Sequence, residues 1–160
     1  MTDIAAVSTD LSASMQYTPG FFSKKHKADP IARVQMIREG VSPEDLKTTV
    51  KEMGVPKEKF FSWLNLPRTT TNRRLKANQA LPAEQSERVI GLQRLIGQVE
   101  NMVYESGVIT GFNSARWLAA WLEQPLPALD NASPAVYMDT MEGIEMVSTL
   151  LAQTQSGAYA

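Results

Sequence analysis

Residues 64–76 read Leu64-Asn65-Leu66-Pro67-Arg68-Thr69-Thr70-Thr71-Asn72-Arg73-Arg74-Leu75-Lys76. The stretch combines a turn with a helix start that is rich in hydroxyl and basic side chains, and no carboxylate occurs between Glu58 and Glu84. Arginine suits contact with phosphates, whereas threonine and asparagine can hydrogen-bond to base edges. The pattern predicts the DNA-reading part of a helix-turn-helix unit, and a solvated basic helix face is the alternative.

Two helix-turn-helix registers fit this region. In the first, Gly54 occupies the turn and residues 57–64 form the recognition helix. That segment is too apolar to meet a DNA groove, because it contains Phe60, Phe61, Trp63 and Leu64. In the second, residues 57–64 precede a turn at 65–67, and residues 68–76 form the recognition helix. We favour the second register, since Asn65 tolerates the left-handed conformation that such a turn needs.

The charge distribution divides the chain into two unlike halves. Residues 24–80 contain thirteen Lys and Arg against six Asp and Glu, whereas residues 81–160 contain three against nine. The formal net charge of −1 therefore hides a basic front half and an acidic back half. Such asymmetry suggests a polyanionic partner for the front half and a different partner for the back half.

Every periodic segment from residue 30 onward predicts a helix, and none alternates with the period of a strand. We therefore expect an all-α protein. The expected helices cover residues 31–38, 43–53, 57–64, 68–76, 84–105, 113–123 and 134–138, with a last one beginning near residue 139. Ser42 followed by Pro43 is a typical helix start. Asp139 together with Glu142 is expected to start the last helix.

The longest expected helix, residues 84–105, has a straight apolar seam. Its members recur at intervals of three and four and are Val89, Leu92, Ile96, Val99 and Val103. Such a seam packs against another helix, either in the core of the same chain or in a second copy.

Several function classes are excluded or disfavoured by what the sequence lacks. The chain has no cysteine, one histidine, no glycine-rich phosphate loop and no carboxylate–histidine cluster with metal-ligand spacing. We therefore expect no enzymatic activity, no metal and no cofactor. No apolar run approaches the ~20 residues that a membrane span needs, and the N-terminus does not resemble a signal peptide. We expect a cytoplasmic protein with no membrane partner.

Three motifs occur in an order that points to one family. The first is the turn followed by R-T-x-x-R-R, and the second is Gln85-Ser86-Glu87-Arg88. The third is a long pattern composed of Trp121-Leu122-Glu123-Gln124-Pro125, Ala128-Leu129, Ser133-Pro134, Met138-Asp139-Thr140, Gly143, Val147, Leu150 and Gly157-Ala158-Tyr159-Ala160. With these motifs the chain resembles the Xre/MbcA/ParS antitoxins, which are paired with RES-domain toxins. It departs from their usual Pro-Asn pair and Gly-Gly turn, having Pro125-Leu126 and Asp130-Asn131 instead.

The composition of the N-terminal residues and the resemblance together imply a division of the chain into four parts. These are a flexible leader at 1–29, an Xre/Cro-like helix-turn-helix domain at 30–82, a connecting and dimerisation helix at 83–106, and a small helical toxin-binding domain at 107–160. The resemblance also implies an antitoxin that represses its own operon as a DNA-binding homodimer. Its C-terminal region would block the active-site cleft of a cognate RES toxin that degrades NAD⁺. The alternative is a stand-alone DNA-binding transcriptional regulator without a toxin partner.

The expected site residues form two sets. The residues expected to contact operator DNA are Arg68, Thr69, Thr70, Thr71, Asn72, Arg73, Arg74 and Lys76. The residues that the resemblance implies for toxin binding are Trp121, Met141, Glu145, Ser148, Gln155, Tyr159 and Ala160. Tyr159 and the terminal carboxylate are expected to enter the toxin's cleft.

Overall fold

The computed structural model describes residues 20–107 and 111–156, and within these ranges the chain is helical without any strand. The elements in chain order are α2 (Phe21–Lys27), α3 (Pro30–Glu39), α4 (Pro43–Met53), α5 (Lys57–Trp63), α6 (Arg68–Lys76), α7 (Ala83–Glu105), α8 (Ser114–Leu122), the 3-10 helices η1 (Pro127–Leu129) and η2 (Pro134–Tyr137), and α9 (Met141–Ser156). The all-α class is confirmed for this part of the chain. None of these helices is long and apolar enough to cross a membrane.

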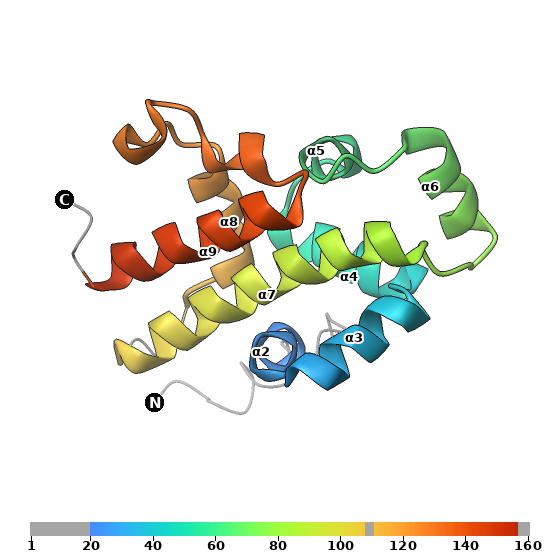
Figure 1. Cartoon of the computed structure of the whole chain (residues 1–160), viewed down its shortest axis with the longest axis horizontal. Helices are drawn as coiled ribbons and strands as arrows, with labels where there is room; N and C mark the ends of the chain where they lie inside the picture. Colours follow the sequence, from blue (N-terminus) through green and yellow to red (C-terminus); the bar gives the residue numbers. More distant parts are fainter. Residues whose placement is uncertain (1–19, 108–110, 157–160) are drawn as a thin grey trace, which may run out of the picture.

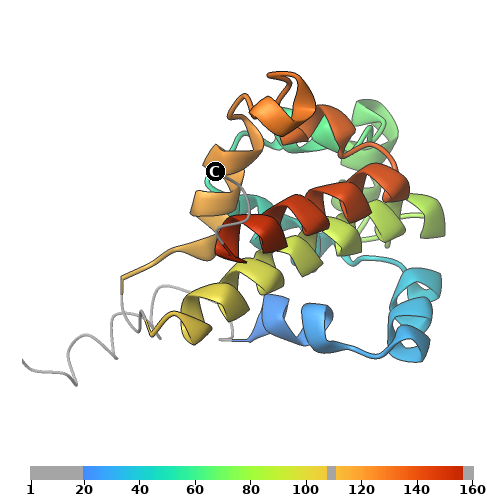
Figure 2. The ribbon, with the colours of Figure 1, turned by 60° about the vertical axis from the view of Figure 1, so that its left-hand side comes forward.

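Helix α7 is the central element of the molecule. It crosses the whole structure, with α2 and α3 on one side and α9 running alongside it in the same direction on the other (Figure 1). The turned view keeps α7 and α9 side by side (Figure 2). The seam residues Val89, Leu92 and Ile96 are fully buried among these neighbours. Helices of the same chain therefore cover these seam residues, as the core-packing alternative predicted, and a role of α7 in dimerisation stays a prediction.

Residues 20–29 are not the flexible leader that the sequence suggested. Helix α2 packs across α7, and Phe22 is only 1% exposed. Gly97 of α7 makes this approach possible, because a Cβ there would collide with the carbonyl group of Phe22. Ser23 adds a hydrogen bond from its Oγ to the carboxylate of Glu100, at 2.7 Å. Residues 1–19 of the expected leader lie outside the described residues.

Short polar side chains cap the starts of α3, α4 and α8, and the sequence predicted the cap at Ser42 but also one at Ser133 that does not form. The Ser42 Oγ accepts a hydrogen bond from the Asp45 N–H at 3.2 Å, and Pro43 occupies the first turn of α4. The start of α9 differs from the prediction. The Oγ1 of Thr140 accepts from the Gly143 N–H at 3.0 Å, so Thr140, and not Asp139, provides the cap.

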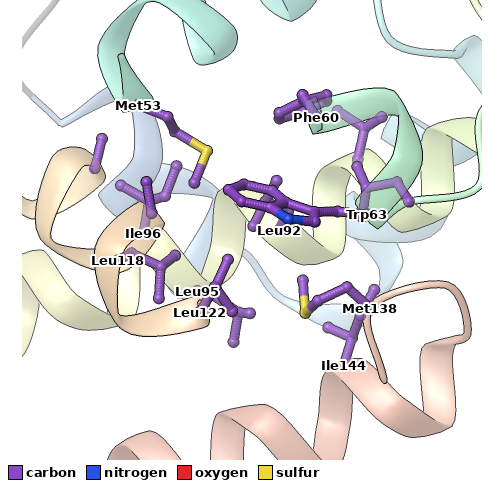
Figure 3. Close-up of a cluster of buried hydrophobic side chains, with 14 of the residues drawn as sticks. Met53, Phe60, Trp63, Leu92, Leu95, Ile96, Leu118, Leu122, Met138 and Ile144 are labelled. Atoms are coloured by element: carbon purple, nitrogen blue, oxygen red, sulfur yellow. The ribbon is translucent and has the colours of Figure 1, made fainter. Parts of the chain in front are cut away.

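The two halves of the chain share one apolar core. Figure 3 shows the indole of Trp63 extending from α5 over Leu92, with Met53 and Met138 on either side of it. Met138 follows η2 in the C-terminal half, whereas Met53 and Trp63 belong to the N-terminal half. Burial of such large side chains stabilises the fold by roughly 1.5–3 kcal/mol each. The core therefore fixes the helix-turn-helix region relative to the C-terminal helices.

Candidate DNA-binding and toxin-binding surfaces

A tight turn brings the chain from α5 into α6. Asn65 adopts the left-handed conformation with φ of 50°, and the Leu66 N–H donates to the Phe61 carbonyl at 2.9 Å. These contacts close the end of α5 in the way that left-handed helix ends do. Arg88 of α7 holds the turn from outside, because its Nε donates to the Leu64 carbonyl at 2.7 Å and its Nη2 to the Asn65 carbonyl at 3.3 Å.

The burial of α5 and α6 agrees with the second helix-turn-helix register. All the large apolar residues at the end of α5 are buried, namely Phe60, Phe61, Trp63 and Leu64. Helix α5 therefore has no large apolar side chain left for a DNA groove, and its exposed residues Lys57, Glu58 and Lys59 carry charges of both signs. Helix α6 is instead anchored by Thr71 and Leu75, one turn apart, and presents the rest of its surface outward.

The outward face of α6 brings together most of the predicted DNA-contacting residues. A surface depression of about 700 Å³ is lined by Arg68, Thr69, Asn72, Arg73, Lys76 and Ala77. Thr70 is also exposed. The Nη2 of Arg68 lies 3.9 Å from the Oε1 of Glu58. Among the described residues no carboxylate lies within 4.0 Å of the other cations of α6, which are Arg73, Arg74 and Lys76. These positive charges are available to an external polyanion.

Thr71 does not belong with these residues. Its side chain is fully buried under α6, and its Oγ1 has no hydrogen-bond partner. The prediction that Thr71 contacts DNA is therefore wrong, since helical periodicity turns this position toward the core together with Leu75. Arg74 is partly buried, and its Nη1 donates to the Ala80 carbonyl at 2.9 Å, which fixes the loop that leads into α7.

Trp121 is a core residue and not an exposed toxin contact. It is 6% exposed, and its ring stacks on Trp117 with centroids 6.1 Å apart. Helix α8 turns Trp121 inward with Leu118 and Leu122. The prediction that Trp121 binds the toxin is corrected accordingly.

The predicted toxin contact Glu145 lies on α9 at the edge that faces α7. Its Oε1 is 3.9 Å from Nη1 of Arg94. Burial lowers the pKa of the Arg94 guanidinium, and the charge of nearby Arg33 acts in the same direction, while Glu145 opposes this. Glu145 thus partly compensates a half-buried cation within the chain.

Two further predicted toxin contacts also engage α7. The Ser148 Oγ donates to the Gln98 Oε1 at 2.8 Å, and the Gln98 Nε2 donates to the Ser148 carbonyl at 2.9 Å. Near the end of both helices, the Gln155 Nε2 donates to the Glu105 Oε2 at 2.9 Å. Together with the Arg94–Glu145 pair, these contacts form a polar ladder that fixes α9 parallel to α7.

The remaining predicted toxin contacts differ in position. Met141 is half-buried in the α7–α9 contact, with its Cε close to Gly91. Tyr159 and Ala160 lie outside the described residues. The outward face of α9 carries residues that the sequence analysis did not select, including Glu142, Met146 and Thr149, all exposed. They lie opposite the buried Ile144, Val147 and Leu151, so helical periodicity alone would have identified them.

No group of three or more potential metal ligands occurs along residues 20–107 and 111–156. The surface of α6 presents cations and hydroxyl groups, whereas the outward face of α9 presents both apolar and polar side chains.

Comparison with known proteins assigns a family to both regions. A model described as the antitoxin Xre-like helix-turn-helix domain matches residues 32–94, and one described as the antitoxin Xre/MbcA/ParS C-terminal toxin-binding domain matches residues 110–157. A curated relative from Sphingobium sp. (strain YBL2), named Prs ADP-ribosylating antitoxin, is 46% identical over 144 residues, covering 89% of this chain and 91% of the relative. The chain belongs to the Xre/MbcA/ParS antitoxins. Within this antitoxin, α6 lies in the helix-turn-helix match and α9 in the toxin-binding match.

Proposed function

We propose that this antitoxin neutralises a RES-domain toxin that degrades NAD⁺, and that it represses its own operon by binding DNA as a homodimer. It acts by binding, without catalysis of its own, in the cytoplasm. The observation that carries this proposal is the pairing of two surfaces in one chain. An exposed cationic helix lies in the region matched to a helix-turn-helix, and α9 leads into the C-terminus within the region matched to a toxin-binding domain.

The DNA-binding part of the proposal rests on α6. Arg73 and Lys76 carry uncompensated charge on its outward face, next to the polar side chains of Thr69 and Asn72. Cations of this kind bind phosphates and set the register on the duplex, whereas the polar side chains meet base edges. A homodimer would then place two copies of α6 on two half-sites about one helical turn apart.

The toxin-binding part rests on α9 and the residues after it. The polar ladder with α7 holds α9 in place, so its outward face is presented from a fixed support. Tyr159 is the aromatic residue of this tail. Such a side chain buries a large area with few rotatable bonds, which suits insertion into a cleft. In this proposal the tail blocks the toxin's active site, and the outward face of α9 covers its rim.

The relative's name indicates the chemistry to test. ADP-ribosylation breaks the bond between nicotinamide and ribose in NAD⁺ and transfers ADP-ribose to an acceptor. We infer that the toxin partner of this antitoxin carries out this reaction, which consumes NAD⁺ and releases nicotinamide. Mass spectrometry of proteins exposed to the toxin would distinguish transfer to a protein from hydrolysis by water, because only transfer adds ADP-ribose to a protein.

Co-expression tests the proposal as a whole. The product of the neighbouring reading frame should stop growth and deplete NAD⁺ when expressed alone. Co-expression with this chain should restore both, and the two proteins should co-purify. A neighbouring product that is harmless by itself would contradict the toxin-binding part. A gel-shift titration of the chain's own promoter at two salt concentrations tests the DNA-binding part separately, and affinity should fall steeply as salt rises.

A further inference from the structure

A second hollow lies on the side of α6 that faces α7. Its volume is about 480 Å³, and it is lined by Thr70, Arg73, Arg74, Gln79, Pro82 and Gln85. Arg73 lines both this hollow and the depression on the outward face of α6. The lining contains two guanidinium groups and no carboxylate. The hollow is therefore an electropositive extension of the candidate DNA surface.

Gln85 is the most informative residue of this hollow. It is only 9% exposed and lines the hollow, yet its side-chain amide has no hydrogen-bond partner among the described residues. The buried polar atoms without a partner in the described part of the chain do not include those of Gln85, so its amide remains accessible from the hollow. An external acceptor in the hollow would satisfy its N–H groups.

The backbone adds a second source of hydrogen-bond donors. Helix α7 begins at Ala83 after Pro82, and no side chain caps this end. The first N–H groups of a helix lack partners within the helix, and the helix dipole favours an anion near them. The one acidic residue of this turn, Glu84, is exposed and does not line the hollow. Arg74 is held in place by the Ala80 carbonyl, and the other N–H groups of its guanidinium remain free to donate.

We propose that this hollow is the binding site for one backbone phosphate of the bound DNA. The Gln85 amide, the first turn of α7 and the guanidinium groups of Arg73 and Arg74 are its donors. Because Arg73 is shared with the outward face of α6, a strand that flanks the groove occupied by α6 passes over the hollow. The inference rests on the proposed DNA binding, and it gives the start of α7 a part in that binding.

A thermodynamic cycle tests this phosphate-binding site. Individual phosphates of the operator are replaced, one position at a time, by uncharged methylphosphonates, and binding of the wild type and of Gln85→Leu is measured. The leucine keeps the size of the side chain and removes its amide. Gln85→Leu should bind unmodified operator and unrelated DNA about tenfold more weakly, since a hydrogen bond to a charged group is lost. It should leave the salt slope nearly unchanged, because no charge is removed. Gln124→Leu, at an exposed position after α8, is the matched control and should change nothing.

The cycle gives distinct outcomes. Replacing one particular phosphate in each half-site should lower the operator affinity of the wild type clearly more than that of Gln85→Leu. Replacing any other phosphate should lower the two affinities equally. If replacement of each phosphate lowers the affinity of both proteins equally while both still bind the duplex, the phosphate-binding site is contradicted and the proposed DNA binding stands. If the wild type does not bind the duplex at all, the phosphate-binding site and the proposed DNA binding are both contradicted. Thermal melting of Gln85→Leu shows whether that variant is folded, and if it is not, Gln85→Glu gives the same readout through charge repulsion.

Inorganic phosphate separates the two possible sources of the anion. In an NMR titration, the Gln85 side-chain amide signals should shift only at millimolar phosphate, because a free ion lacks the other contacts of a duplex. Saturation at micromolar phosphate would make a free phosphate compound the ligand and would overturn the assignment to DNA.

Discussion

Arg73 is the residue on which the DNA-binding surface depends most, because it lines both hollows of α6. Arg73→Ala should weaken binding to the operator and to unrelated DNA by the same factor. It should also lower the slope of log affinity against log salt by about one, since one phosphate contact is lost. Fluorescence anisotropy at several salt concentrations measures both quantities.

The control for Arg73 is Arg38→Ala, at an exposed position near the end of α3. It changes the net charge equally but lies outside α6. An equal loss of affinity in the two variants would mean that overall charge, and not the position of Arg73, determines binding.

Thr71 provides a test of its reassignment to the core. Because its buried Oγ1 has no partner, Thr71→Val removes an unsatisfied polar group at almost constant volume. The free energy of unfolding should rise by about 1 kcal/mol, and operator affinity should stay the same. Denaturant unfolding and anisotropy measure the two effects. A clear loss of affinity in a stably folded Thr71→Val would return Thr71 to the DNA-contacting set.

His26 makes stability depend on pH. Burial against α7 lowers its pKa below the ordinary value of 6.5, and the charges of Arg94, Lys27 and Arg33 act in the same direction. Between the lowered pKa and 6.5 the unfolded chain binds more protons than the folded chain, so stability falls as the pH drops below 6.5. Thermal melting from pH 7.5 to 5.5 should show this fall. His26→Gln should reduce it, and an unchanged pH dependence in that variant would exclude His26 as its source.

At the scale of elements, the two buried glycines of α7 are expected to respond differently to alanine. At Gly97 the added Cβ would meet the backbone of α2, which cannot move away without undocking that helix. Gly97→Ala should therefore lower stability by about 1–3 kcal/mol despite the better helix propensity of alanine.

Gly91 is the matched control in the same helix. A Cβ there would lie 3.1 Å from the Cδ1 and 3.2 Å from the Cγ2 of Ile144, which are side-chain atoms that need to move by only a few tenths of an ångström. Gly91→Ala should be nearly neutral, because alanine favours the helix. Equal losses of stability in the two variants, measured by denaturant unfolding, would contradict the docking of α2 through Gly97.

The elements could be predicted where the signal was local. The Ser42-Pro43 start of α4, the turn at Asn65 and the apolar seam of α7 each depend on neighbouring residues. The docking of α2 could not be predicted, because it depends on Gly97, about seventy residues away in the chain. Conversely, the seam showed that α7 packs against other helices but not whether they belong to the same chain.

The candidate site was predictable to a similar extent. The position of α6 and most of its exposed residues followed from sequence, and Thr71 and Leu75 could have been separated from them by periodicity. On α9, Glu145, Ser148 and Gln155 were selected without knowledge of the face that α7 covers. The position of Gln85 in the hollow could not be predicted, because it depends on how α6 and α7 are placed together.

For the whole molecule, the arrangement separates the two binding surfaces. Helix α6 lies beside the start of α7, whereas α9 runs along α7 toward the other end of that helix (Figure 1). A helix of the length of α7, 23 residues, spans roughly 35 Å. In the proposed function, DNA and toxin are therefore bound at separate surfaces of one core, and a change at one surface should leave the other intact.

The proposed toxin is the product of the neighbouring reading frame, and its release of nicotinamide from NAD⁺ tests the separation of the two surfaces most directly. The toxin is mixed with equimolar full-length antitoxin, with Arg73→Ala, or with a chain that ends at residue 156. The full-length chain and Arg73→Ala should both abolish nicotinamide release, whereas the shortened chain should leave it largely intact while melting as the full-length chain does. Complete inhibition by the shortened chain would contradict the account, and so would loss of inhibition in Arg73→Ala.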